Sequence, residues 1–261
     1  MAEQKKKGLN TNSNTYIIVY SAIMVIIVAF LLAFIFKALK PMQDVNVALD
    51  KKKQILAALN IRNLDNQLSA EKYAEVVEAD NIIDVEGNIT TEGAKGGEEA
   101  GFILNSSNYK AGELALYVCN VGGETKYVVS VYGMGLWGPI WGFVAVNDDC
   151  KTVYGAYFNH DSETAGLGAE IKDSKIWQEQ FRGKTIYSLA EDGSLAEAIL
   201  TVSKKVDNPE CQVDGVTGAT LTCNGVTAML KDGFTKYRGF LSKNGKANVK
   251  QADEATEEEV E

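Results

Sequence analysis

The sequence predicts an α+β protein in which a single N-terminal transmembrane helix is followed by a domain with a central antiparallel sheet. Three observations support this fold class. A long apolar run lies near the N-terminus, β-rich runs joined by turn residues fill the middle of the chain, and apolar residues recur every three or four positions near the C-terminus. The 261 residues, of which 46% are hydrophobic, are enough for one large domain or two small ones.

The apolar run extends from Tyr16 to Phe36 and contains no charged residue. A helix needs roughly 20 apolar residues to cross a bilayer, and its backbone polar groups must be bonded internally. We therefore expect an N-terminal tail over 1–14 and a retained transmembrane helix over 15–37. A cleaved signal peptide fits less well, because the run is too long and no good cleavage site precedes Pro41. Lysines flank the run on both sides, so charge alone does not assign the side of the membrane on which the domain lies.

Residues 41–110 are expected to form a helical and linker region. Apolar positions such as Leu49 and Ile55 recur between charged residues, which indicates one apolar helix face. A second short helix is expected from about Ser69 through Val77. The polar, glycine-rich stretch GNITTEGAKGGEEAG follows as a connector.

The period changes at Leu114. Four β-rich runs between Leu114 and Phe158 are joined by short turns, among them VGGET and DDCK, and predict an antiparallel meander. A short helix, IWQEQF, is expected after Asp173. These elements belong to a domain that we expect over 111–245.

The final helix has the clearest pattern. Thr222 or Asn224 could cap its N-terminus, and Gly239 or Gly245 could mark its end. Residues 246–261 are rich in acidic side chains and are expected to form a disordered acidic tail. Apolar residues occupy one face of the helix at Val226, Met229, Leu230, Phe234, Tyr237 and Leu241.

The charge and the cysteines exclude several functions. Much of the net charge of −9 lies in the acidic tail, and no basic patch stands out, so nucleic acid is not expected as a partner. The four cysteines are far apart and form no C-x-x-C pair, which argues against a zinc ribbon or an iron–sulfur cluster; no metal site is expected. Free thiols and disulfides both remain open for Cys119, Cys150, Cys211 and Cys223.

The stretch DGVTGAT, from Asp214 to Thr220, leads directly into the final helix. Thr220 therefore lies at or just before a helix N-terminus, where free N–H groups and the helix dipole favour an anion such as a phosphate. Gly218 and Ala219 lack bulk, so a large group can approach the chain closely. Taken alone, the stretch is also typical of an ordinary capped turn.

Two further glycine-rich stretches could hold a flat ligand. In VYGMGLWGPIWG, the glycines allow close approach and Trp137 or Trp141 could stack on a ring, although tryptophans beside a β-turn are also typical of a core. In NHDSETAGLGAEI, the loop could bend around a ligand, while the single histidine, His160, is more typical of a structural hydrogen bond. A hydrolytic triad, a Walker loop and a dinucleotide fingerprint are all missing from the sequence.

Together these motifs make the chain resemble the NqrC family, the flavin-carrying component of the sodium-translocating NADH:quinone oxidoreductase. DGVTGAT fits the family's flavinylation motif D-x-x-[ST]-G-A-[ST] at every fixed position, and GLWGPIWG and the E-T-x-G-L-G loop are also similar to that family. Ala165 stands where proline is expected, which affects loop stiffness more than chemistry. The related G component of the Rnf electron-transport complex is an alternative, which the long segment between the anchor and the sheet disfavours. A membrane-anchored ligand-binding domain without a redox role is a second alternative.

The resemblance implies a covalently flavinylated electron-transfer subunit that passes electrons from NADH toward quinone, coupled to sodium export. A flavin transferase would use FAD and leave FMN joined through its phosphate to Thr220, and no catalytic residue is expected beyond the flavin. The implied partners are the transferase, the inner membrane and the other subunits of the complex, with the domain on the periplasmic side. The other residues that we expect around the flavin are Asp214, Gly215, Thr217, Gly218, Ala219, Leu136, Trp137, Glu163, Thr164, Gly166, Leu167 and Gly168.

Overall fold

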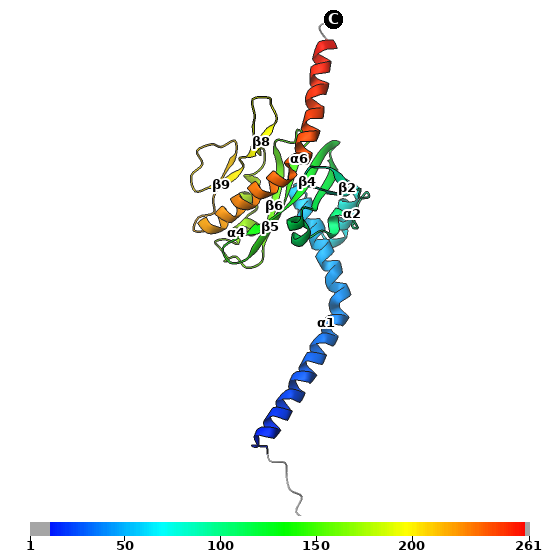
Figure 1. Ribbon diagram of the computed structural model, residues 1–261, viewed down its shortest axis with the longest axis vertical. Helices are drawn as coiled ribbons and strands as arrows, with labels where there is room; N and C mark the ends of the chain where they lie inside the picture. The colour runs from blue at the N-terminus through cyan, green and yellow to red at the C-terminus, as the bar shows by residue number, and fades with distance from the viewer. Residues whose placement is uncertain (1–10, 259–261) are drawn as a thin grey trace, which may run out of the picture. The chain divides into compact units, whose positions relative to one another are not determined.

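The computed structural model describes residues 11–258, and from residue 245 onward it describes the backbone alone. The chain divides into two compact units, Met1–Ala48 and Leu49–Glu261. Helix α1 spans Asn14–Ala58 and contains Pro41, so the residues before and after this proline form one continuous helix (Figure 1). Among the described residues, α1 is the one helix long and apolar enough to cross a membrane. This agrees with the expected membrane anchor.

The second unit is built on one six-stranded antiparallel sheet, with strand order β2-β1-β3-β4-β5-β6 (Figure 1). The sheet confirms the α+β fold class, and its last four strands are the meander expected from the sequence. Consecutive strands of the meander pair antiparallel, for example with Tyr132 opposite Trp141, and the register shifts once, between Ala145 and Val146 of β5 where it pairs with β6. The six strands are β1 Val77–Ile83, β2 Ile89–Thr91, β3 Leu114–Val121, β4 Glu124–Met134, β5 Pro139–Asn147 and β6 Val153–His160.

Short helices and two small two-stranded sheets complete this unit. A parallel pair, β9 Thr201–Ser203 with β10 Gln212–Asp214, leads into the last helix, and β7 Tyr187–Leu189 pairs with β8 Leu195–Ala198. The helical elements before α6 are α2 Asn66–Val76, the 3-10 turn η1 Gly101–Ile103, α3 Ser106–Ala111, α4 Glu170–Asp173 and α5 Lys175–Glu179.

The sequence missed strand β1. We expected Val77 to continue the second helix, but α2 ends at Val76 and Val77 begins the strand. Two polar residues, Asp80 and Asn81, lie in the middle of β1 and are almost fully buried, so the strand lacks the apolar alternation that would reveal it. The connector after it is also partly ordered, as β2 and η1.

Helix α6, Thr220–Glu258, covers one face of the sheet and packs against β4 (Figure 1). All six apolar residues expected on its inner face are buried. At Gly233, a Cβ atom would lie 2.4 Å from Val131 Cγ1 of β4, so a larger residue would push helix and sheet apart. The backbone of α6 runs to Glu258, and the disordered acidic tail over 246–261 stays a prediction, with residues 259–261 outside the described ones.

The expected ends of α6 were wrong. The helix begins at Thr220, so Thr222 and Asn224 lie inside it rather than at a capping position. Gly239 also lies inside the helix, where its missing side chain gives room to a neighbouring loop: a Cβ atom there would be 2.6 Å from the carbonyl carbon of Glu86. Gly245 likewise falls within the helix and does not end it.

Strand β6 forms one edge of the sheet, and the chain segment that follows α1 protects this edge. Asn60 Nδ2 donates a hydrogen bond to the carbonyl of Tyr154 (3.0 Å), and Arg62 Nη2 donates one to the carbonyl of Ala156 (3.1 Å). These donors occupy acceptor groups of β6 that would otherwise attract another strand.

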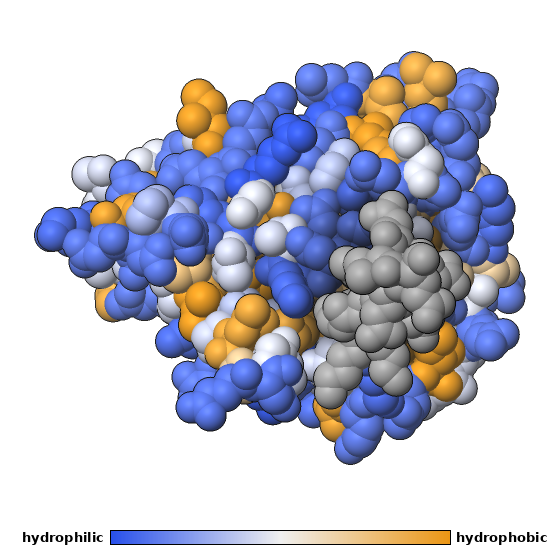
Figure 2. Space-filling model, turned by 90° about the horizontal axis from the view of Figure 1, so that it is seen from above, coloured by the Kyte–Doolittle hydropathy of each residue, from blue (hydrophilic) through white to orange (hydrophobic). Residues whose placement is uncertain are grey.

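The four cysteines are free and buried, which answers the question that the sequence left open. From the end of the domain where α6 leaves it, the surface is mostly hydrophilic with small separate apolar groups (Figure 2).

Candidate functional site

The 214–220 segment is held at its first residue and exposed at its end. The backbone N–H of Asp214 donates to Gln180 Oε1 (3.1 Å), and its carbonyl accepts from Trp177 Nε1 (2.8 Å). Gly215 then donates to the carbonyl of Ser203 at 2.8 Å. The side chains of Asp214, Thr217 and Thr220 are exposed, whereas Ala219 is buried. The segment therefore presents hydroxyl groups to solvent from an anchored base.

Thr220 is the first residue of α6. The first turn of a helix leaves backbone N–H groups without intrahelical partners, and the positive end of the helix dipole lies there. Gly218, two residues earlier, has φ of 79°, a left-handed conformation that favours glycine. A Cβ atom at Gly218 would lie 2.8 Å from Leu167 Cδ2, so the glycine also allows the E-T-x-G-L-G loop to approach.

A pocket of about 310 Å³ opens beside Thr220. The volume is at the lower end of the range typical of small-molecule sites. Five of its residues were not among the flavin contacts expected from the sequence: Val202, Lys204, Val216, Cys223 and Asn224. Cys223 lies one turn after Thr220, a spacing that could have indicated it, whereas no sequence signal points to Lys204. The pocket is lined by Val202, Lys204, Asp214, Gly215, Val216, Thr217, Gly218, Thr220, Cys223 and Asn224.

Three segments meet at Glu163, which is 7% exposed: the GLWG turn (135–138), the E-T-x-G-L-G loop and the first turn of α6, which follows the 214–220 segment directly. Glu163 Oε1 accepts a hydrogen bond from the backbone N–H of Trp137 (2.9 Å), and Glu163 Oε2 accepts one from Thr222 Oγ1 (2.6 Å). We call Glu163, Thr222 and the Trp137 N–H the Glu163 cluster. It joins the GLWG turn, the E-T-x-G-L-G loop and the first turn of α6.

The backbone is fitted closely around this carboxylate. Cβ atoms at Gly135 and Gly168 would lie 2.4 Å from Glu163 Oε1 and Oε2, respectively, so neither position accepts a larger residue without movement. Burial alone would raise the pKa of Glu163, but hydrogen bonds from Thr222 and from the backbone of Trp137 and Leu136 lower it below its usual value. Glu163 is therefore a buried carboxylate held in its ionised form.

The other residues expected from the GLWG turn and the E-T-x-G-L-G loop fall into two groups. Some have exposed side chains, and others shape the backbone of the loop. Leu136, Trp137 and Leu167 are exposed by 47%, 66% and 41%, and their loops are joined at Glu163. The carbonyl of Thr164 accepts from the N–H groups of Leu167 and Ala169, which closes the loop, and Gly166 adopts a left-handed φ of 72° within it.

Two of the residues considered from the sequence have structural roles. His160 Nδ1 accepts a hydrogen bond from the backbone N–H of Glu163 (3.1 Å), in agreement with the structural role expected for it. Trp141 donates through Nε1 to Gln54 Oε1 (3.1 Å), so it packs against the end of α1 and not beside the 214–220 segment. Of these two motif tryptophans, Trp137 is the one whose backbone N–H belongs to the Glu163 cluster.

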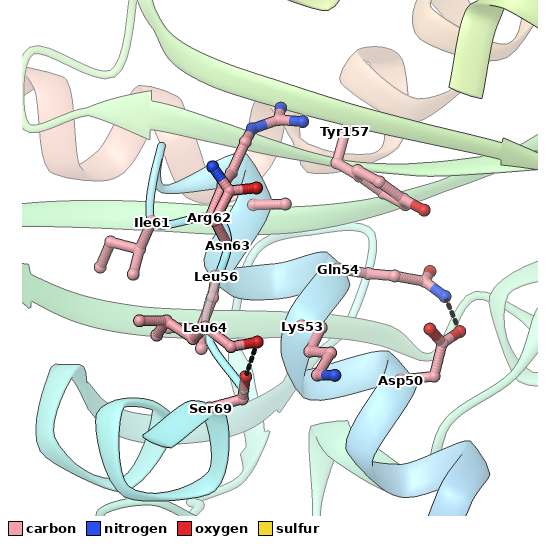
Figure 3. A pocket seen from close by; sticks show the side chains of 11 residues that line it. Asp50, Lys53, Gln54, Leu56, Ile61, Arg62, Asn63, Leu64, Ser69 and Tyr157 are labelled. Atoms are coloured by element: carbon pink, nitrogen blue, oxygen red, sulfur yellow. Dashed lines mark hydrogen bonds between the residues drawn. The ribbon is translucent and has the colours of Figure 1, made fainter. Parts of the chain in front are cut away.

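A second pocket, of about 220 Å³, lies where α1 ends (Figure 3). Its charged residues are of both signs, with Asp50 and Lys53 from α1 and Arg62 from the following turn. Asp50 Oδ2 accepts from Gln54 Nε2 (2.6 Å), and the Arg62 guanidinium lies 6.0 Å from the centre of the Tyr157 ring. None of the residues described as lining this pocket belongs to the three motifs, so we assign it to the packing of α1 against the edge of the sheet.

Comparisons with known proteins agree with this geometry. Residues 135–235, which include the GLWG turn, the Glu163 cluster and the 214–220 segment, match the FMN-binding domain family. NqrC of the Na(+)-translocating NADH-quinone reductase of Haemophilus ducreyi is 32% identical over 80% of this chain and 87% of its own length. Its counterpart in Pseudomonas aeruginosa is 28% identical over 90% and 98% of the two chains.

Solved structures extend the likeness to the fold. The crystal structure of NqrC from the Na(+)-translocating NADH-quinone reductase of Parabacteroides distasonis superposes with a TM-score of 0.70 and 31% identity, covering 78% of this chain and 97% of that one. NqrC of Shewanella oneidensis has a TM-score of 0.56 at 22% identity, a likeness of fold alone. With the likeness in sequence to relatives along most of their length, this shows that the chain belongs to the NqrC family of the Na⁺-translocating NADH-quinone reductase.

Proposed function

We propose that the chain carries FMN joined through its phosphate to the hydroxyl of Thr220 and passes electrons within a Na⁺-translocating NADH:quinone reductase. The observation that carries the proposal is the position of Thr220. Its side chain is exposed, it is the first residue of α6, and it lines a pocket of about 310 Å³. The neighbouring hydroxyl of Thr222 is buried and bonded to Glu163, so it is not available for attachment.

The residues around Thr220 fit a phosphate ester. One negative charge remains on a phosphodiester, and the N-terminus of α6 stabilises negative charge. Lys204 lines the same pocket and supplies a positive charge. A modifying enzyme must be able to reach the Thr220 hydroxyl. Gly218, two residues before it, is exposed and has no side chain that would block this approach.

Attachment requires a flavin transferase and FAD. The Thr220 oxygen forms a bond to the phosphorus of the FMN half, the bond between the two phosphates of FAD breaks, AMP leaves, and the hydroxyl proton is released. The protein's own contribution is to present the hydroxyl on the anchored 214–220 segment. The exposed Asp214 side chain begins that segment and is a candidate contact for the transferase.

The flavin ring is expected to rest on exposed apolar side chains near the segment. Leu136 and Trp137 extend from the GLWG turn and Leu167 from the adjoining loop, and all three are exposed. Covering them with a flat ring removes apolar surface from water, and an aromatic side chain adds a stacking contact. Bound in this place, FMN supplies the ability to accept and pass on electrons.

The domain is proposed to lie on the periplasmic side of the inner membrane, anchored by α1. The resemblance to the family supports this side, whereas the lysines that follow the apolar run favour the opposite one. The other subunits of the complex would supply the NADH site and the sodium pathway. Protease added to spheroplasts with an intact inner membrane distinguishes the two orientations, because only a periplasmic domain is digested.

The attachment site is tested by intact mass and in-gel fluorescence of the chain co-expressed with its transferase. Thr220→Ala should lose all covalent FMN. The structure offers Thr235→Ala as the matched control, because Thr235 is also an exposed threonine of α6 but lies outside the motif and the pocket, and this variant should keep the flavin. Covalent flavin on the Thr220→Ala protein, or its loss from Thr235→Ala alone, would overturn the assignment.

A further inference from the structure

A second site stands apart from the flavin motifs, in the connector between β1 and η1. Asp80 lies in the middle of β1 and is 1% exposed. Its Oδ2 accepts hydrogen bonds from the backbone N–H groups of Ala100 and Phe102, both at 3.1 Å. Its Oδ1 is buried and accepts no hydrogen bond from the described part of the chain. A buried carboxylate oxygen without a partner is costly, so this atom points to a ligand.

The connector wraps its backbone around this oxygen. A Cβ atom at Gly93 would lie 2.3 Å from Asp80 Oδ1, and one at Gly97 would lie 1.9 Å from it, so only glycine fits at either position. The wrap is held in place by two long-range hydrogen bonds. Gly93 N–H donates to Asn81 Oδ1 (2.8 Å), and Tyr73 Oη donates to the carbonyl of Gly97 (3.1 Å).

Asp80 and the connector line a pocket of about 810 Å³ whose charged residues are all acidic. Glu92, Glu98 and Glu99 join Asp80 in its wall, and the other residues that line it are small or carry a hydroxyl: Thr91, Gly93, Ala94, Gly96, Gly97 and Ala100. Carboxylate and backbone carbonyl oxygens are the ligands of hard cations, and the described wall offers no histidine or cysteine to a softer metal.

Lys51 and Lys52 are engaged elsewhere, and Lys95 of the connector is exposed and does not line the pocket. Lys51 Nζ donates to the carbonyls of Phe102 and Leu104, and Lys52 forms an ion pair with Glu98. Lys51 interacts electrostatically with Asp80 and offsets part of its charge without occupying Oδ1. Within the described residues no three acidic, histidine or cysteine side chains already converge as a metal site. Carbonyl groups and water must therefore complete the coordination, which favours a weak site.

We propose that this connector binds Ca²⁺, with Asp80 Oδ1 as the buried anionic ligand, connector carbonyls as neutral ligands and Glu92 or Glu99 closing from the rim. Calcium suits the site better than Mg²⁺, because it accepts irregular coordination by several oxygens, whereas Mg²⁺ requires a near-ideal octahedron. With few charged ligands, the expected dissociation constant is on the order of 10⁻⁴–10⁻³ M. The bound ion would hold β1, the connector and η1 together, independently of the flavin.

The test uses the full chain in detergent after removal of divalent ions with a chelator. Tb³⁺, a luminescent substitute for Ca²⁺, should bind close enough to Tyr73 to be excited through its ring, and added Ca²⁺ should displace it. Calcium should also raise the unfolding temperature in a saturable way. A chain that shows neither a calcium-displaceable signal nor a thermal shift up to about ten times the expected dissociation constant overturns the proposal.

Variants locate the ion. Asp80→Asn keeps an oxygen acceptor for Ala100 and Phe102 but should abolish the calcium response. The rim double variant Glu92→Gln/Glu99→Gln leaves the buried carboxylate intact and should weaken calcium binding several-fold, which covers the case that Asp80→Asn does not fold. Glu191→Gln/Glu197→Gln removes the same charge from the exposed β7–β8 hairpin and should bind as the unaltered chain does. Equal weakening by the rim and hairpin variants would show non-specific attraction and overturn the proposal.

Discussion

Two neighbouring parts of the candidate site differ in their exposure to solvent. The 214–220 segment exposes Thr217, Gly218 and Thr220, whereas the Glu163 cluster, which includes Thr222 only two residues further on, is almost fully buried. The exposed part has the hydroxyl at which we propose that a flavin transferase attaches FMN. The buried part fixes the start of α6 and the two loops that approach it. A hydroxyl can be offered to a modifying enzyme at a defined position because a hydrogen-bonded carboxylate holds the backbone behind it.

This comparison predicts opposite consequences for substitutions in the two parts. Removing the hydroxyl of Thr220 in the exposed part should prevent flavin attachment and leave the fold intact, while changes in the Glu163 cluster should lower stability first. The stability measurements below use the chain expressed without flavin transferase, so that loss of flavin does not contribute to them.

The largest loss of stability is expected from Glu163→Ala. It leaves the buried Thr222 hydroxyl and the Trp137 N–H without their acceptor and should lower the free energy of unfolding by about 2–4 kcal/mol. Urea denaturation measures the loss. Glu163→Gln keeps an acceptor in the same place and should cost less than half as much; equal losses for the two variants would contradict the role assigned to these hydrogen bonds.

Thr222→Val is expected to cause the second-largest loss of stability. It conserves shape but removes a hydrogen bond to a charged, buried acceptor, and should cost about 1–3 kcal/mol. Thr222→Ser keeps the hydroxyl and serves as the matched control, with an unfolding midpoint close to that of the unaltered chain. If valine is tolerated as well as serine, the Glu163 cluster does not hold the start of α6.

Alanine substitutions at two glycines distinguish the effect of backbone strain from the effect of a contact with Leu167. Gly218 and Gly166 both have positive φ, so alanine at either position should cost about 1–2 kcal/mol. Only at Gly218 would the new methyl group meet Leu167, at 2.8 Å, whereas nothing lies within 4 Å at Gly166. Gly218→Ala should therefore also shift the absorbance and fluorescence of the attached flavin, and Gly166→Ala should not. Identical flavin spectra for the two variants would show that Leu167 does not contact the ring.

Much of the fold could be predicted because its signals are local. The meander and the buried face of α6 follow from runs and periods within single segments, and all six apolar positions predicted for α6 are buried. Strand β1 could not be predicted, because its central residue is the buried Asp80, whose Oδ2 accepts hydrogen bonds from backbone groups that lie 20 and 22 residues away. A buried polar residue with distant partners resembles a loop residue when the sequence is read alone.

The site shows the same limit. The three motifs could be predicted as separate stretches. That the carboxylate of one of them binds the start of α6 could not, because the hydrogen bond between Glu163 and Thr222 joins residues 59 positions apart. The sequence suggested Thr222 as a helix cap and Glu163 as a flavin contact. The structure places Thr222 inside α6 and gives both carboxylate oxygens of Glu163 partners within the protein. Contact between Glu163 and flavin stays a prediction.

The smallest expected effect concerns pH and tests the charge of Glu163 directly. The hydrogen bonds of the cluster hold the pKa of Glu163 below its ordinary value of 4.5, which describes the unfolded chain. A carboxyl group whose pKa is lower in the folded state adds stability above the unfolded pKa and loses that contribution as pH falls through the folded pKa. The unaltered chain should therefore be more stable than the Glu163→Gln variant at pH 7. This difference in stability should shrink below about pH 4.5 as the carboxylate takes up a proton. Unfolding midpoints of the two proteins between about pH 7 and pH 3 measure this difference, and because all other carboxyl groups are common to both, their titration cancels. A difference that stays constant across this range would mean that Glu163 contributes through its shape and hydrogen bonds and not through its charge.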